Sequence, residues 1–291
     1  MKKTGIIADS HSGVTKEQAE KLGIRVLPMP FYFYGVCFYE GEGITRDEGL
    51  KRIEGGEKVT TTQPTPEAVM EIWDEALSEN DEILYFPISS GLSGSCNTAM
   101  LLASDDKYDG RVFVVDNGRI SVPQVCSILD SLEMIKAGKD AAFIKNLLES
   151  KPDDFDIYVG VEDIKYLQQG GRISAASAFI GRMLSIKPML RLRRGLLEKY
   201  KECRGSVKLR KEMIACAKAS IEEMEAAGLD KNRLRVISAS CLYSDDIGKW
   251  TDEVQAAFPD HKVIYGDLSL GIACHLGPGG IGVGFSFTPE Y

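Results

Sequence analysis

The chain has 291 residues, of which 44% are hydrophobic and 27% charged, a balance typical of a globular protein with one large or two ordinary domains. Its formal net charge of −8 argues against nucleic acid or anionic membrane as a partner, because both favour a basic surface. No apolar stretch approaches the ~18 residues of a membrane span, the seven cysteines form no Cys-x-x-Cys pair, and there are only three histidines. We therefore expect a cytoplasmic protein with reduced thiols, no metal or other cofactor, and at most transient membrane contact.

The first half of the chain alternates short apolar runs with helical patterns. Thr65 before Pro66 is typical of an N-cap followed by proline at the first helical position. Strands alternating with helices of this length predict a parallel sheet covered by helices on both faces. The expected strands are residues 5–9, 24–28, 82–86 and 111–116, with an aromatic run at 31–34, and the expected helices include 15–22, 66–77 and 96–103.

The pattern changes near Pro152. Two alternating runs flank Arg194-Gly195 and predict an antiparallel hairpin. We therefore predict a two-domain α/β protein, with a parallel sheet in an N-terminal domain (1–157) and a mixed sheet in a C-terminal α/β domain (158–291). The expected elements of the second half are strands at 155–160, 187–193, 196–203 and 235–239, helices at 207–227 and 246–258, and a glycine-rich final strand.

A serine- and glycine-rich loop at residues 88–95 joins one predicted strand to a predicted helix. The first-turn N–H groups of a helix have no partner within it, and the macrodipole favours negative charge there. The loop has four serines but no Lys, Arg or carboxylate, so it suits a small, weakly charged anion such as a carboxylate better than a triphosphate. Asp9 and Asp116 are expected beside it, because they too follow strands of the same sheet.

Ser93 and Gly94 lie in the middle of this loop, and Ser93 has two interpretations. The neighbouring glycines allow close backbone approach, which predicts a hydrogen bond from Ser93 to a bound group. The surrounding sequence also resembles the G-x-S-x-G nucleophile elbow of serine hydrolases, with His275 as the candidate base. Ser95 stands where the elbow has its second glycine, so the hydrolase remains the alternative.

Thr61, Thr62 and His275 are further candidates for ligand contact. In the threonine-rich segment 60–65, helix capping explains the hydroxyl of Thr65 only. For Thr61 and Thr62, ligand contact and a role in a simple turn are equally open. His275 precedes Leu-Gly-Pro-Gly-Gly, which predicts a loop shaped around a bound group. An ordinary core or surface histidine is the alternative.

Several arginines are also candidates. Arg172 follows a Gly-Gly pair after a predicted helix, where it could neutralise helix-end carbonyls or reach a carboxylate or phosphate. In the hairpin, Arg191 and Arg193 alternate in phase with Lys199 and Lys201, which predicts one positive face. Such a face is either solvated or suited to docking an acidic partner or a phosphorylated head group.

Residues 175–186 form a small-residue-rich, apolar run. Core packing is the default interpretation of such a run. An apolar tunnel between the two domains is the alternative.

Taken together, these segments resemble the DegV family, the bacterial fatty-acid-binding proteins (FakB-type) that serve a fatty acid kinase. The resemblance covers essentially the full length, and it is specific because several motifs occur in the right order. The matching segments are residues 7–10, 61–64, 88–95, 115–116, 167–174, 181–188, Arg204 and 275–279.

The resemblance implies a lipid carrier that buries one long-chain fatty acid and catalyses nothing itself. It implies that Ser93, Thr61 or Thr62, and His275 hold the carboxylate through a hydrogen-bond network, with Arg172 close by. A separate fatty acid kinase would phosphorylate this carboxylate with ATP, and the protein would carry the acyl phosphate onward.

The resemblance also implies that Arg204 belongs to the kinase-docking surface, and we place Arg191 and Arg193 of the basic hairpin there too. The chain departs from the family at His11, where a small hydroxyl residue is usual, and at Leu276, where a threonine commonly follows the histidine. Gln168 and Gln169 replace the common lysine. These departures bear on the head-group network and on the choice of ligand.

Two other functions stay open. A serine hydrolase would use Ser93 and His275. A lipid-responsive sensor would share every site residue with the carrier but would need no kinase.

Overall fold

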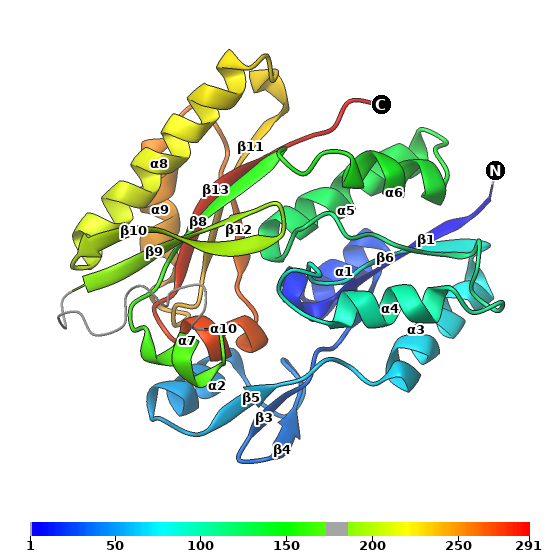
Figure 1. The fold of residues 1–291 in the computed structure, drawn as a ribbon, viewed down its shortest axis with the longest axis horizontal. Helices are drawn as coiled ribbons and strands as arrows, with labels where there is room; N and C mark the ends of the chain where they lie inside the picture. Colours follow the sequence, from blue (N-terminus) through cyan, green and yellow to red (C-terminus); the bar gives the residue numbers. More distant parts are fainter. Residues whose placement is uncertain (1, 173–185) are drawn as a thin grey trace.

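The computed structural model describes residues 2–172 and 186–291, and its first sheet is a four-stranded parallel one (Figure 1). Every neighbouring pair of strands in it runs parallel, as the alternating pattern predicted. The strands, in their order across the sheet, are β2 (Arg25–Leu27), β1 (Thr4–Asp9), β6 (Glu82–Phe86) and β7 (Val112–Val114).

Helices cover both faces of this sheet because successive strand residues point to opposite sides. Ile6 and Ala8 pack with α1 (Lys16–Leu22), α5 (Ser121–Lys136) and α6 (Ala141–Glu149). Ile7 packs instead with α3 (Pro66–Glu79) and α4 (Ser95–Ala103). At the start of α3, Thr65 accepts a hydrogen bond from the N–H of Ala68, which confirms the predicted cap.

The second sheet has six strands and is mixed, as expected. Within the described strands of this second sheet, only the β11–β12 pair is parallel, and β9 and β10 form the predicted hairpin around Arg194-Gly195. The strands across the sheet are β10 (Leu196–Arg204), β9 (Ile186–Arg193), β8 (Phe155–Gly160), β13 (Ile281–Phe287), β11 (Leu234–Ser240) and β12 (Ile264–Asp267).

The expected domain boundary after residue 157 falls within β8. Every residue of β8, from Phe155 to Gly160, pairs with β13 in one continuous register, from Ser286 to Ile281. The strand therefore belongs to the second sheet as a whole. The division into two domains stays a prediction.

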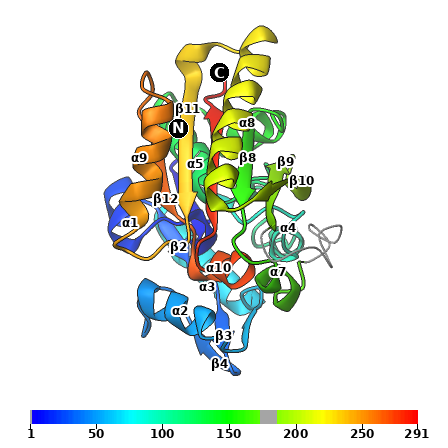
Figure 2. The same cartoon turned by 90° about the vertical axis from the view of Figure 1, so that its left-hand side faces the viewer.

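The two faces of the six-stranded sheet have different neighbours (Figure 2). Helices α8 (Ser206–Ala226) and α9 (Ile247–Ala257) cover one face with apolar side chains. The other face is turned toward α5, which packs against β11, β12 and β13. Arg235 of β11 forms an ion pair with Asp130 of α5, at 2.7 Å, so α5 joins the two large sheets.

A third, three-stranded sheet lies at one end of the molecule and was not expected from the sequence (Figure 1). Its strands have three residues each, too few to show a period of two. It brings Thr61 to the end of β5, beside α10. The remaining elements are β4 (Val36–Phe38), β3 (Phe31–Phe33), β5 (Val59–Thr61), α2 (Arg46–Glu54), α7 (Lys165–Gln169), α10 (Leu270–Leu276) and the 3-10 helices η1 (Ser10–Ser12) and η3 (Lys231–Arg233).

Among the described residues, no helix combines the length and the apolar character that crossing a membrane requires.

Candidate functional site

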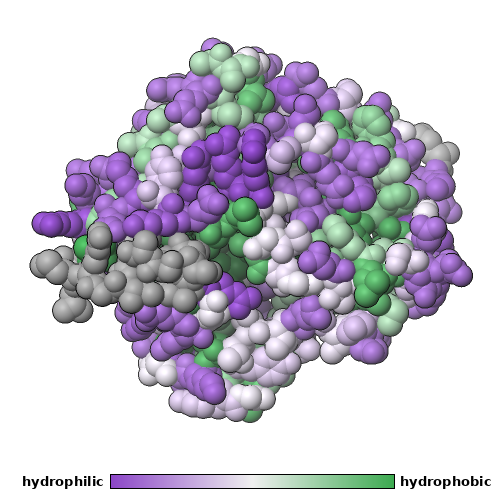
Figure 3. All heavy atoms as spheres, in the orientation of Figure 1, coloured by the Kyte–Doolittle hydropathy of each residue, from purple (hydrophilic) through white to green (hydrophobic). Residues whose placement is uncertain are grey.

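A cavity of about 300 Å³ lies between the six-stranded sheet, the serine-glycine loop and α10. This volume falls in the range of small-molecule sites. In Figure 3, hydrophobic side chains lie in a hollow near the middle of the face shown, with hydrophilic side chains above and below it.

One wall of the cavity is apolar. It is formed by Ile157 and Val159 of β8, Leu192 of β9, Leu197 of β10 and Gly282 of β13. These residues share one face of the six-stranded sheet because strand side chains alternate between faces. A hydrocarbon chain lying against them would lose its contact with water.

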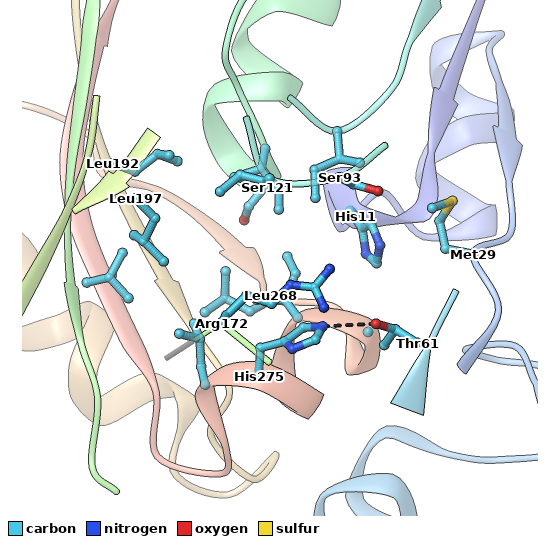
Figure 4. A pocket seen from close by; sticks show the side chains of 18 of the residues that line it. His11, Met29, Thr61, Ser93, Ser121, Arg172, Leu192, Leu197, Leu268 and His275 are labelled. Atoms are coloured by element: carbon cyan, nitrogen blue, oxygen red, sulfur yellow. Dashed lines mark hydrogen bonds between the residues drawn. The ribbon is translucent and has the colours of Figure 1, made fainter. Parts of the chain in front are cut away.

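The other end of the cavity is polar (Figure 4). His11, Thr61, Ser93, Arg172 and His275 border the same space there, from segments far apart in the chain. Thr62 and Gly94 also line the cavity, so it gathers all six ligand-binding candidates of the sequence. Their contact with a ligand stays a prediction.

His275 lies in the last turn of α10, so the loop expected around it was wrong. Ser269 caps this helix by accepting the N–H of Ile272, and Gly277, with φ of 76°, ends it. The glycines after His275 were interpreted as a loop around the imidazole, but they end helix α10 instead.

The His275 ring is held at the polar end by Thr61. Its Nε2 lies 3.0 Å from Thr61 Oγ1. Burial lowers the pKa of His275 to about 4, and the positive charge of Arg172 acts in the same direction. The imidazole is therefore neutral at pH 7. When Nε2 carries the proton, Thr61 Oγ1 accepts it, and the Thr61 hydroxyl proton is free for a ligand.

Ser93 also keeps a proton for a ligand. Its Oγ accepts hydrogen bonds from the N–H and the hydroxyl of Ser95, at 3.2 and 3.1 Å. A hydroxyl has one proton and two acceptor positions, so these bonds leave the Ser93 proton available. In the described part of the chain, His275 Nε2 hydrogen-bonds Thr61 rather than Ser93, and no carboxylate hydrogen-bonds its ring. The serine–histidine and histidine–carboxylate hydrogen bonds of a catalytic triad are therefore not formed among the described residues.

Two aspartates hold the serine-glycine loop in place, as predicted from their positions after strands. Asp9 Oδ2 accepts the N–H of Ile88 at 2.6 Å, and Asp116 Oδ1 accepts that of Ser90 at 3.2 Å. Asp9 is fully buried, and burial raises its pKa to about 7 against several hydrogen bonds that lower it. The main chain of the loop is therefore held by two carboxylates that do not line the cavity.

Arg172 lies at the end of α7 and at the cavity, and its contact with a ligand stays a prediction. Its Nη1 donates to the carbonyl of Gly170 at the end of α7, at 2.9 Å, and the side chain also lines the cavity. Among the described lining residues it is the one with a full charge at neutral pH, since none of them is Asp, Glu or Lys. The apolar run at 175–186 lies outside the described residues except for Ile186, which begins β9.

His11 is a lining residue that sequence reasoning named only as a departure from a family pattern. The residue is 9% exposed, and its Nδ1 lies 2.9 Å from Ser269 Oγ. Its place after β1, at the carboxyl end of a parallel strand, was the available signal.

The basic hairpin does not have the single positive face that was predicted. The register shifts between Lys199 and Lys201, and Lys199 lies opposite Leu190, whereas Arg191 lies opposite Glu198. Cross-strand partners share a face, so Lys199 and Arg191 point to opposite sides. The register set at the turn is the physical reason, because it pairs Arg193 with Leu196 and therefore Leu190 with Lys199. The bulge comes after Lys199, and it brings Lys201 opposite Met189, on the side of Arg191.

The arginines of the hairpin are already paired within the protein. Arg191 binds the buried carboxylate of Asp156, and Arg193 lies 3.1 Å from Asp153. Arg204 differs, because it is exposed and no ion pair joins it to another described residue. A role in partner binding stays a prediction for all three, and Arg204 is the one of them without an ion pair to a described residue.

Comparison with known proteins gives one consistent family. The family model described as "Uncharacterised protein, DegV family" matches residues 3–288. A DegV domain-containing protein of Deinococcus radiodurans is 28% identical, over 96% of each chain. A solved structure described as fatty acid binding of a DegV family protein from Thermus thermophilus is 30% identical, with a TM-score of 0.85 over 98% of this chain and 99% of that one.

A second solved structure agrees with the first. DegV from Bacillus subtilis, described as a fatty acid binding protein, is 25% identical, with a TM-score of 0.81 over 99% of this chain and 100% of that one. In the part of our chain that the structure covers, no group of three or more His, Cys, Asp or Glu residues could hold a metal ion.

Proposed function

The chain belongs to the DegV family, and we propose that it binds one long-chain fatty acid in the cavity between its large sheets. The carboxylate lies at the polar end, where Ser93, Thr61 or Thr62, and His275 hydrogen-bond it beside Arg172. The hydrocarbon chain lies against the apolar wall of the six-stranded sheet. Relatives of the same fold from Thermus thermophilus and Bacillus subtilis are described as fatty-acid-binding, which supports this assignment.

The observation that carries this proposal is the charge of the cavity lining. It is mostly apolar, and Arg172 is the one described lining residue with a full charge. A ligand with one negative charge and a long apolar body matches both features. Burial of a sixteen-carbon chain contributes about 10 kcal/mol before ordering costs, at ~0.8 kcal/mol per CH₂, so hydroxyl and imidazole donors suffice to orient the head group.

We further infer that the protein presents this carboxylate to a separate fatty acid kinase. A carboxylate oxygen attacks the γ-phosphorus of ATP on the kinase, ADP leaves, and the acyl phosphate remains in the cavity for transport. The carrier supplies position rather than catalysis. Arg204, which is exposed and forms no ion pair with a described residue, contributes to the docking surface for the kinase.

A lipid-responsive sensor is the second candidate, because it uses the same cavity. The two functions differ in one measurable property. With a cognate kinase and ATP, a carrier's bound acid is consumed, whereas a sensor's bound acid stays unchanged.

Native mass spectrometry of the purified protein, followed by extraction of the ligand, tests the proposal. We expect a stoichiometric adduct with the mass of a long-chain fatty acid. A protein that is empty and takes up no added palmitate would refute fatty acid binding. Turnover of an activated short-chain ester with an adduct on Ser93 would support the hydrolase instead.

A further inference from the structure

His11 places a second imidazole at the polar end of the cavity, where it lines the same space as His275 (Figure 4). The main chain fixes its position. The N–H of His11 donates to Asp9 Oδ1 at 3.1 Å, in the short helix η1 that directly follows β1. The backbone that carries the His11 ring is therefore held in place by hydrogen bonds.

The helix opposite makes room for this ring. A Cβ atom at Gly271 of α10 would lie 2.4 Å from His11 Cε1, closer than side chains approach one another. Gly271 is inside a helix, where alanine is otherwise favoured by about 1 kcal/mol. The absent side chain gives the space that the imidazole occupies.

The hydrogen bond to Ser269 determines which ring nitrogen faces the ligand as a donor. Ser269 Oγ is buried, accepts the N–H of Ile272, and lies 2.9 Å from His11 Nδ1. Its hydroxyl proton has no other acceptor among the described residues, so it goes to Nδ1, because a buried hydroxyl left unpaired is costly. A neutral ring that accepts at Nδ1 carries its own proton on Nε2.

We propose that His11 Nε2–H is a further donor to the ligand carboxylate, and that it makes the site favour the ionised acid over uncharged derivatives of the same chain length. The inference rests on the proposed function, since it assumes that the carboxylate lies at the polar end. Hydrogen bonds to a charged acceptor are about twice as strong as neutral ones, which is the source of the discrimination.

Substitution of His11 by asparagine or by glutamine distinguishes the roles of the two ring nitrogens. The amide of Asn can reach Ser269 as Nδ1 does, whereas the longer Gln can present an N–H near the position of Nε2. The test measures the affinities of delipidated protein for palmitate and for methyl palmitate. We expect His11→Asn to weaken palmitate binding about tenfold or more, with little change for methyl palmitate. His11→Gln should restore most of the palmitate affinity.

Two further variants complete the design. Gly271→Ala forces the His11 ring from its place, so it should reproduce the selective loss of palmitate. His261→Asn, at a histidine outside the cavity, serves as the matched control and should bind as the wild type does. Thermal unfolding of each variant separates a lost donor from a lost fold.

Three outcomes would overturn the inference. These are equal weakening by the Asn and Gln variants, equal losses for palmitate and its ester, or unchanged affinity in His11→Asn. A wild-type protein that binds neither ligand would instead refute the proposed function.

Discussion

Gly282 is the position at which one substitution should change the length of acid that the cavity accepts. It lies on β13, in the apolar wall. A Cβ atom there would lie 3.7 Å from Ala239 Cβ and 3.7 Å from Ile157 Cγ2, which is ordinary van der Waals contact. The backbone of Gly282 is not in the left-handed region. Gly282→Val should therefore fold well, since valine suits a strand, and its side chain should enter the cavity.

The magnitude follows from the volume that the new side chain takes. Valine adds three carbons, which displace roughly three methylenes of a chain that fills the cavity. At ~0.8 kcal/mol per buried CH₂, the loss is about 2.4 kcal/mol, or about 60-fold in affinity. The variant should bind an acid that is three or more carbons too short to fill the cavity with almost the wild-type affinity.

Titration of delipidated protein with saturated acids of 12 to 18 carbons measures this effect. We expect the variant's affinity to fall for the longest acids and to stay unchanged for the shortest, with an unaltered unfolding temperature. The same loss at every length would mean that Gly282 acts on the head group or on the fold. No loss at any length would mean that the chain lies elsewhere.

Four other predictions concern the polar end and the docking surface. Ser93→Ala should weaken retention of the acid by ~1–3 kcal/mol, because a charged acceptor loses a donor; unchanged retention in a displacement assay would exclude Ser93 as a head-group ligand. Thr61→Val keeps the shape but removes the partner of His275, so palmitate binding should fall by a similar amount while methyl palmitate binding holds. Arg204→Ala should leave lipid binding intact and slow consumption of the bound acid by kinase and ATP; an emptied cavity would contradict a docking role. As the pH falls from 6.5 to 4, the unfolded chain binds a proton that buried His275 excludes, since its pKa is lowered to about 4. The free energy of unfolding should then fall by up to about 1.4 kcal/mol per pH unit through this group, and a His275→Gln variant that unfolds with the same pH dependence would contradict it.

Much of the fold could be predicted because its signals are local. The Thr65 cap, the strands of the parallel sheet and the β9–β10 hairpin depend on neighbours within a few residues, and each lies close to the predicted position. The serine-glycine loop and Asp9 also meet as expected, because parallel strands end at the same edge of a sheet.

The remaining features depend on contacts between distant segments. Helix α10 is short, and glycines follow it, so its sequence resembles a loop. The register that turns Lys199 away from Arg191 is set by the pairing of β10 with β9 across their turn. His11 enters the cavity because Gly271, 260 positions further along the chain, has no side chain in its way.

The hydrogen bond between Thr61 and His275 joins residues 214 positions apart, and this separation affects when the protein can first take up its ligand. During synthesis, Thr61 and the serine-glycine loop leave the ribosome long before α10 does. All strands of the four-stranded sheet, which ends with β7 at Val114, have been synthesised before α10. This sheet can therefore fold early, as the chain emerges. The polar end is incomplete until α10 has folded against β5, so lipid loading follows translation of nearly the whole chain. If the chain binds a fatty acid as proposed, the ligand binds only the assembled protein and therefore stabilises it by mass action.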